Sequence, residues 1–227
     1  MNDEAHSLIT AARAVARAGL VDAFGHLSIR TSHATVLLTP PKPLSSLTNR
    51  DEPAVLQLGC TELPDSAPKE AWIHVALMER DAKIGAVCRA QPRAVAAIAA
   101  VGRVPRALNG HAAMLGPIAM HRDSRLIRDR STAEMIACAT DTSKALVLRG
   151  NGAVTWGSHL ADAVASMWVL ERSAELELRA ATAGTPAPLP LDERSWWHDR
   201  ADELLPRIYR YLQLATSDPL QPSFDVM

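Results

Sequence analysis

The chain has 227 residues, of which 48% are hydrophobic and 22% are charged, with a formal net charge of −1 and a pI near 6.7. This length suits one α/β domain with a large core and is rather short for two domains. A net charge so close to zero gives no electrostatic attraction for nucleic acid or an anionic membrane, and no apolar run approaches membrane length. We therefore expect neither as a partner.

The cysteines and the first residues indicate a cytoplasmic protein. Cys60, Cys88 and Cys138 are an odd number without CxxC spacing, so neither a disulfide framework nor a zinc knuckle is indicated. The opening residues MNDEAHSL lack the basic and apolar regions of a signal peptide.

The first half of the chain alternates helical and extended patterns. Apolar residues at helical spacing predict helices, and short alternating or apolar runs bounded by turn residues predict strands. In chain order the predicted elements are a helix over 6–19, strands over 26–30, 35–39 and 54–58, a helix over 70–80, a strand over 84–88 and a helix over 92–101.

The second half is predicted to be mainly helical. Ser131 and Glu134 have the capping-box spacing, Ser158 is the predicted cap of a long helix, and Pro206 is expected to kink or split the last helix. The predicted elements are an irregular segment over 104–120 that ends in a strand at 117–120, a helix over 131–140, strands over 145–149 and 153–156, and helices over 158–181 and 192–212.

Four segments appear in an order that resembles a known family. They are AFGHLSIR, LLTPPKPLSSL, PKEAWIHVALMERDAKIGAVCRAQP and ALVLRGNGAVTWGSHLADAVASMWVLERSAELEL. They are similar to the Gly-Asn-x-Ser-x-Arg strand, the Thr-Pro loop, the Ser-Ser-Glu-x-x-x-His helix with its His-x-His-Pro strand end, and the His-Gly turn with the long helix of the class II aldolase/adducin family. The resemblance covers residues 11–181.

The resemblance implies a fold and an assembly. The fold is α/β, a three-layer α/β/α domain with a mixed central sheet, as in fuculose-phosphate aldolase. We expect residues 1–183 to form this domain. Residues 184–227 are expected to be a linker, a helix and a tail that pack on the same domain or on a neighbouring subunit. The implied assembly is a homotetramer with sites between subunits.

The resemblance also implies a zinc or manganese ion held by three histidines, with a glutamate as general acid/base. In this sequence the three histidine positions fall on Arg89, Gln91 and Asn151. A guanidinium has no lone pair to donate and repels a cation. We predict that this metal site is lost and that no cofactor is bound. The alternative is a relocated metal site built from Glu70, His26 and His111, because two histidines and a carboxylate are an accepted ligand set.

Three residues are the catalytic candidates. Glu70 keeps the glutamate position of the family and is either a general acid/base or a carboxylate that stabilises a helix N-terminus. Arg89 either replaces the charge of the metal or forms an ion pair with Glu70 that closes the site. His26 takes the place of a substrate-binding asparagine and can carry a proton near neutral pH. His74, four residues after Glu70, is interpreted as a core residue.

Five further residues are the candidates for substrate binding. Thr39 lies in the Thr-Pro loop, and Lys69 stands beside Glu70 where the family has a phosphate-binding serine, although a solvated surface lysine is the simpler interpretation. Gln91, Asn151 and His111 belong to segments that approach the site in the family, while an asparagine between two glycines is also expected in any turn.

The sequence therefore predicts a lyase- or isomerase-like protein that acts on a small carbonyl or carboxylate compound without a metal. The first alternative is a non-catalytic binding or assembly module with a decayed site, like the adducin head. The second alternative is a metal-dependent aldolase or decarboxylase with relocated ligands.

Overall fold

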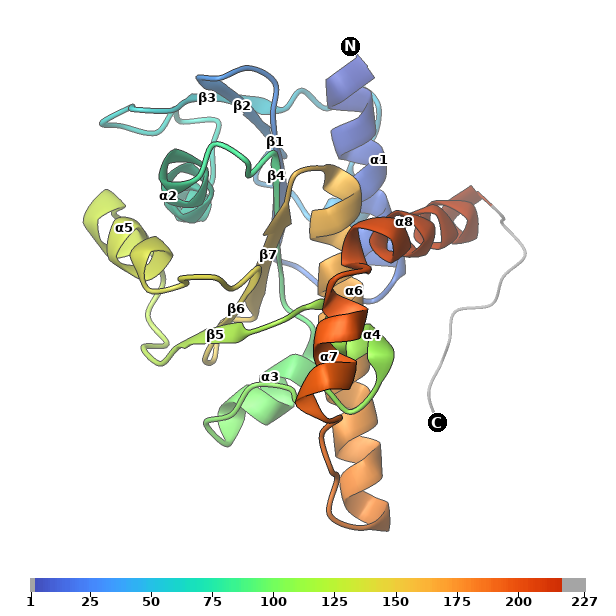
Figure 1. Cartoon of the computed structure of the whole chain (residues 1–227). Coiled ribbons are helices and arrows are strands. Elements are labelled where there is room, and N and C mark those ends of the chain that lie inside the picture. The colour runs from blue at the N-terminus through green and yellow to red at the C-terminus, as the bar shows by residue number, and fades with distance from the viewer. Residues whose placement is uncertain (1–2, 218–227) are drawn as a thin grey trace.

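A mixed sheet of seven strands forms the middle layer of the protein (Figure 1). The computed structural model describes residues 3–217. The strand order is β3-β2-β1-β4-β7-β6-β5, and every neighbouring pair is antiparallel except β5 and β6, which are parallel. The strands are β1 (His26–Arg30), β2 (Thr35–Leu38), β3 (Ala54–Gln57), β4 (Ala86–Ala90), β5 (Ile118–His121), β6 (Ala145–Leu148) and β7 (Ala153–Gly157).

Helices cover both faces of this sheet, so the predicted α/β fold with a mixed central sheet is confirmed. Figure 1 shows α2 (Trp72–Arg80) and α5 (Arg130–Cys138) on one face, with α1, α6 and α8 on the other. Within residues 3–217 no helix combines the length and apolar character needed to span a membrane. The other helices are α1 (Asp3–Arg17), α3 (Arg93–Ala100), α4 (Gly110–Met114), α6 (Leu160–Ala183), α7 (Leu191–His198) and α8 (Ala201–Ser217), with short 3-10 helices η1 (Leu44–Ser46) and η2 (Lys69–Ala71).

Two apolar cores lie on the two faces of the sheet, and β4 contributes to both. Ala86, Cys88 and Ala90 join the core that contains α1 and α6, whereas Val87 joins the core beneath α2 and α5. Because side chains alternate along a strand, Arg89 lies on the same face as Val87. A fully buried arginine therefore enters the layer between the sheet and α2.

Several predicted boundaries differ from the structure. The strand predicted over 84–88 is displaced to Ala86–Ala90, because the charge of Arg89 interrupts the apolar run while its backbone still pairs with β1 and β7. The helix predicted to begin at Glu70 starts as the 3-10 turn η2 before α2.

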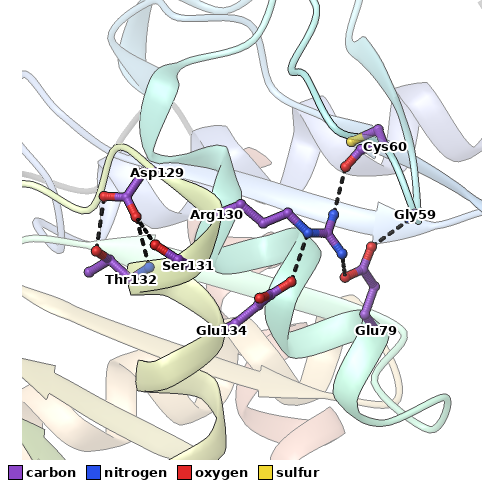
Figure 2. Close-up of polar contacts among 8 residues, drawn as sticks. All are labelled: Gly59, Cys60, Glu79, Asp129, Arg130, Ser131, Thr132 and Glu134. Atoms are coloured by element: carbon purple, nitrogen blue, oxygen red, sulfur yellow. Dashed lines mark hydrogen bonds and ion pairs between the residues drawn. The ribbon is translucent and has the colours of Figure 1, made fainter.

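The predicted caps of two helices, and the prediction that one segment is irregular, also differ from the structure. The Asp129 side chain accepts from the backbone N–H of Thr132, so the N-cap of α5 precedes the predicted capping box (Figure 2). The N-cap of α6 is His159 instead of Ser158. The irregular segment contains the five-residue helix α4, whose N-cap is Asn109. A helix this short leaves little periodicity in the sequence.

The helix predicted over 192–212 is broken, but the break does not lie at Pro206, where a kink or split was expected. The break falls at 199–200, between α7 and α8, and Pro206 lies inside α8. The reason is packing: α7 lies against α4, whereas α8 lies against α6 and α1. α8 continues to Ser217, and the tail expected at the end of residues 184–227 falls on residues 218–227, which lie outside the described part of the chain.

Arg130, the first residue of α5, ties this helix to α2 and to the loop after β3 (Figure 2). Its guanidinium donates to Glu79 at 2.6 Å, to Glu134 at 2.7 Å and to the carbonyl oxygen of Cys60 at 2.6 Å. It also lies 5.7 Å from the ring centroid of Trp72. The network holds the loop that leads into η2.

We expect Arg130→Ala to lower the free energy of unfolding by about 2 kcal/mol, because Glu79 and the Cys60 carbonyl lose a charged donor. Urea unfolding followed by circular dichroism measures this change. Arg125→Ala is the matched control, because Arg125 pairs with Asp123 while 88% exposed and should change stability very little. Equal losses in the two variants would contradict a structural role for the network.

Candidate functional site

Polar side chains meet at one edge of the sheet, on the face covered by α2. β4 and β6 both run antiparallel to β7, and β1 runs antiparallel to β4. The ends of β4 and β6 and the beginning of β1 therefore lie at the same edge. This topology brings together Arg89 from β4, Asn151 from the turn after β6, and His26 from β1. The turn η2 adds Glu70.

Arg89 points at Glu70 and Asn151. Its Nη2 lies 2.6 Å from Asn151 Oδ1, 3.2 Å from the Asn151 carbonyl oxygen and 3.3 Å from Glu70 Oε1. Asn151 Nδ2 also donates to Glu70 Oε1, at 3.2 Å. Burial lowers the pKa of Arg89, and the charge of Glu70 opposes this shift. The Arg89 side chain is 1% exposed and that of Glu70 is 20% exposed, so Glu70 is the member of this pair that reaches solvent.

The turn between β6 and β7 explains how Asn151 reaches Arg89. Gly150 and Gly152 have φ values of +73° and +82°, in the left-handed region that favours glycine. A Cβ atom on Gly152 would lie 2.1 Å from the carbonyl oxygen of Ala90. The turn therefore packs directly on the end of β4, where both oxygens of Asn151 can accept from one guanidinium nitrogen.

A second polar group, which the sequence did not reveal, lies next to Arg89. His26 Nδ1 is 2.6 Å from His74 Nε2, and His74 Nδ1 is 2.6 Å from Ser28 Oγ. Burial, the neighbouring His74 and the charge of Arg89 together hold the pKa of His26 well below its usual value. Burial and the charge of Arg89 lower the pKa of His74 to about 3. Both imidazoles are therefore neutral near pH 7.

His74 is buried, as its interpretation as a core residue requires, but it is also a hydrogen-bonding residue. The sequence signal that could have found the group is spacing. Ser28 follows His26 by two residues on a predicted strand, which places both side chains on one face. Nothing in the spacing shows that α2 brings His74 over that face.

Some buried polar atoms of this edge lack partners. Arg89 Nε, Arg89 Nη1 and His26 Nε2 have no hydrogen-bond partner among the described residues. Buried polar atoms of native proteins are almost always hydrogen-bonded, so three such atoms on two neighbouring side chains are unusual. They mark the interior of the site.

Gln91 and Thr39 lie near this group. The side chain of Gln91 lies beside Gly152, next to Asn151, and its backbone N–H donates to the carbonyl of Leu20 at 3.1 Å. Thr39 is buried, and its hydroxyl accepts from the backbone N–H of Leu27 at 3.1 Å. The Thr39 hydroxyl therefore holds the end of β2 against β1.

Lys69 and His111 are placed differently. The Lys69 side chain is exposed beside Glu70. His111 is exposed on α4, with its ring edge-on to Trp197 at 6.5 Å between centroids. Through this contact His111 belongs to the packing of α4 against α7. Within residues 3–217 no group of three or more His, Cys, Asp or Glu side chains is placed to hold a metal ion, so Glu70, His26 and His111 are not assembled as ligands.

The residues at this edge do not fit the metal ion that the resemblance implies. A guanidinium in hydrogen-bond contact with Glu70 places a fixed positive charge beside the carboxylate that would face the ion. Asn151 and Gln91 carry amides where imidazoles would be needed. The donor set therefore suits an ion pair instead of a divalent cation.

Comparison with known proteins agrees with this architecture. Residues 6–178 match the family described as "Class II Aldolase and Adducin N-terminal domain". A 3,4-dihydroxyphthalate decarboxylase from Terrabacter sp. (strain DBF63) is 28% identical over 200 residues, which cover 81% of this chain and 84% of that protein.

Two solved structures show the same fold. L-fuculose 1-phosphate aldolase from Glaciozyma antarctica PI12 has a TM-score of 0.80 at 20% identity, covering 94% of this chain and 88% of that one. An aldolase II superfamily protein from Pseudomonas syringae has a TM-score of 0.75 at 18% identity, covering 96% and 93%. The family match spans most of the sequence, and this chain therefore belongs to the class II aldolase and adducin N-terminal domain family.

Proposed function

We propose that this protein is a metal-independent lyase-class enzyme that acts on a small carbonyl or carboxylate compound at the edge formed by Glu70, Arg89 and Asn151. The observation that carries the proposal is the combination of hydrogen bonds and solvent exposure at the Glu70 carboxylate. Its carboxylate accepts from both Arg89 and Asn151 and is still 20% exposed. A carboxylate fixed by two donors and open to solvent is suited to carry a proton to or from a ligand.

Glu70, Arg89 and Asn151 have three different roles in the proposed reaction. Glu70 contacts the substrate and carries the proton. Arg89 is buried in contact with Glu70 and supplies a fixed positive charge toward which negative charge can develop. Asn151 orients both. In a decarboxylation the bond between carbon and carboxylate breaks, CO2 leaves, and the carbon keeps the electron pair and takes one proton. The decarboxylase relative favours this member of the lyase class.

A non-catalytic binding or assembly module is the second candidate, and the burial of Arg89 favours it. A 1% exposed arginine paired with the only carboxylate of the group is what a closed, inactive site would contain. Both candidates include the homotetramer that the family resemblance implies and the cytoplasmic location expected from the cysteines and the opening residues, and they differ in whether a ligand is turned over.

Release of CO2 from 3,4-dihydroxyphthalate and from a panel of small hydroxy- and keto-carboxylates, measured with and without EDTA, tests the proposal. We expect turnover that EDTA does not change and that Glu70→Gln reduces by about 100-fold or more. The control is Glu62→Gln, an exposed carboxylate in the preceding loop, which should keep full activity.

Two outcomes would reject the proposed function. Metal analysis that finds more than about half an equivalent of zinc or manganese per chain would reject metal independence, because a bound ion needs its own ligand set. No turnover of 3,4-dihydroxyphthalate or of a panel of small hydroxy- and keto-carboxylates would favour the binding module.

A further inference from the structure

Three buried side chains, Ser28, His74 and His26, form a chain of two hydrogen bonds. The positions of their hydrogens determine which group donates and which accepts in each bond. Ser28 is fully buried, and among the described residues its hydroxyl has no partner other than His74. A buried hydroxyl hydrogen that points at no acceptor is costly, so Ser28 donates to His74 Nδ1.

The donor and acceptor roles in the Ser28–His74 bond also determine the roles in the His74–His26 bond. A neutral imidazole has one N–H donor and one acceptor nitrogen. Since His74 accepts at Nδ1, its hydrogen is on Nε2 and is donated to His26 Nδ1. His26 must then carry its own hydrogen on Nε2, the atom that has no partner within residues 3–217. The serine thus sets the tautomers of both histidines.

The neighbour of His26 on this face of the sheet is Arg89, a side chain that carries only hydrogen-bond donors. His26 and Arg89 are direct partners in the β1–β4 ladder, so their side chains are neighbours on one face of the sheet. Arg89 Nε and Nη1 are also buried donors without partners in the described part of the chain. Donors cannot satisfy one another, and the missing component is an acceptor.

We propose that His26 Nε2–H and the free N–H groups of Arg89 bind a carbonyl oxygen of the substrate, with Ser28 and His74 as positioning residues that hold His26 as a donor. This inference rests on the proposed lyase function and specifies the substrate group that the site receives. When the bond to the departing CO2 breaks, the electron pair left on the carbon is delocalised onto this oxygen as an enolate, and the carbon then takes a proton from Glu70.

The charge balance of the site favours a carbonyl oxygen over a carboxylate as the bound acceptor. Arg89 is already paired with Glu70. A carboxylate would bring a second negative charge against one positive charge in a buried group, which is unfavourable. A carbonyl oxygen accepts the same hydrogen bonds without adding charge. The wild-type site should therefore prefer the neutral acceptor.

Nitrogen-15 NMR of histidine side chains tests the tautomers directly. At pH 7 we expect both His26 and His74 to carry hydrogen on Nε2. Ser28→Ala should shift His74 toward the Nδ1–H tautomer, because the donor that sets the direction is lost, whereas a merely packing serine would leave the tautomers unchanged. A wild-type His26 with its hydrogen on Nδ1 would overturn the proposal.

Formamide and formate, added separately at equal concentrations, test the acceptor. The His26 Nε2–H resonance of the wild type should move with formamide and not with formate, while that of the exposed His33 should move with neither. Glu70→Gln should gain a response to formate, because Arg89 is then unpaired. No response of the wild type to formamide would refute the site, even where Glu70→Gln does not fold. These signals need no turnover, so a positive result without CO2 release would refute the proposed reaction alone.

Discussion

Glu70→Gln should destabilise the protein more than Arg89→Met, although both substitutions break the same ion pair. The reason is the difference in exposure between the two partners. Glu70→Gln leaves a cation that is 1% exposed without its counter-charge, which we expect to cost about 3 kcal/mol. Arg89→Met removes the buried charge and leaves a carboxylate that water can reach, so we expect a loss of about 1 kcal/mol, mainly from the unpaired oxygens of Asn151. Urea unfolding of each variant measures both losses.

The double variant provides the control for this comparison. Once Arg89 is methionine, Glu70→Gln has no buried cation to leave unpaired, so the double variant should be about as stable as Arg89→Met alone. Equal losses in the single variants, or losses that add in the double variant, would show that the buried charge does not dominate at this edge.

The free energy of unfolding should fall as the pH is lowered from 6.5 to 5, chiefly because of His26 and His74. In the unfolded chain both should have pKa values near 6.5. In the folded protein the pKa of His74 is about 3 and that of His26 is well below its usual value. Over this range the unfolded state binds more protons than the folded state, and His74 alone should remove about 1.5 kcal/mol of stability between pH 6.5 and pH 5. The lowered pKa of His26 adds to this loss in the same direction.

Other groups change this slope in known directions. Glu171 has a raised pKa caused mainly by burial, so its protonation opposes the loss. Asp51 and Asp129 have lowered pKa values from their hydrogen bonds and act at lower pH. Urea unfolding at several pH values gives the slope. His74→Leu should make the slope smaller, and the exposed His33→Gln should leave it unchanged. A slope unaffected by His74→Leu would contradict the assignment.

The fold could be predicted because its signals are local. Apolar periodicity locates most elements, and the order of the four family-like segments identifies the architecture. Where prediction was wrong, tertiary contacts decided the outcome. The backbone pairing of β4 extends past the charge of Arg89, α4 is too short to show a period, and the last helix breaks where its two halves pack on different neighbours.

The candidate site could be predicted only in part, for the same reason. An ion pair with Glu70 was one of the two interpretations of Arg89 from the sequence, and the structure shows that contact. The link from Ser28 through His74 to His26 depends on how α2 packs on β1, which no spacing records. The unpartnered nitrogens become visible only once every neighbour is in place.

The turn around Asn151 has a consequence for evolution. Because Gly152 leaves no room for a side chain against Ala90, the turn keeps its shape and Asn151 stays on Arg89. Replacing Arg89 by histidine would leave Asn151 and Glu70 without their donor before any second imidazole is present at Gln91 or Asn151. A histidine at position 89 alone therefore costs stability without completing a set of three histidines. The Arg89–Glu70 ion pair therefore opposes the acquisition of a three-histidine site one residue at a time.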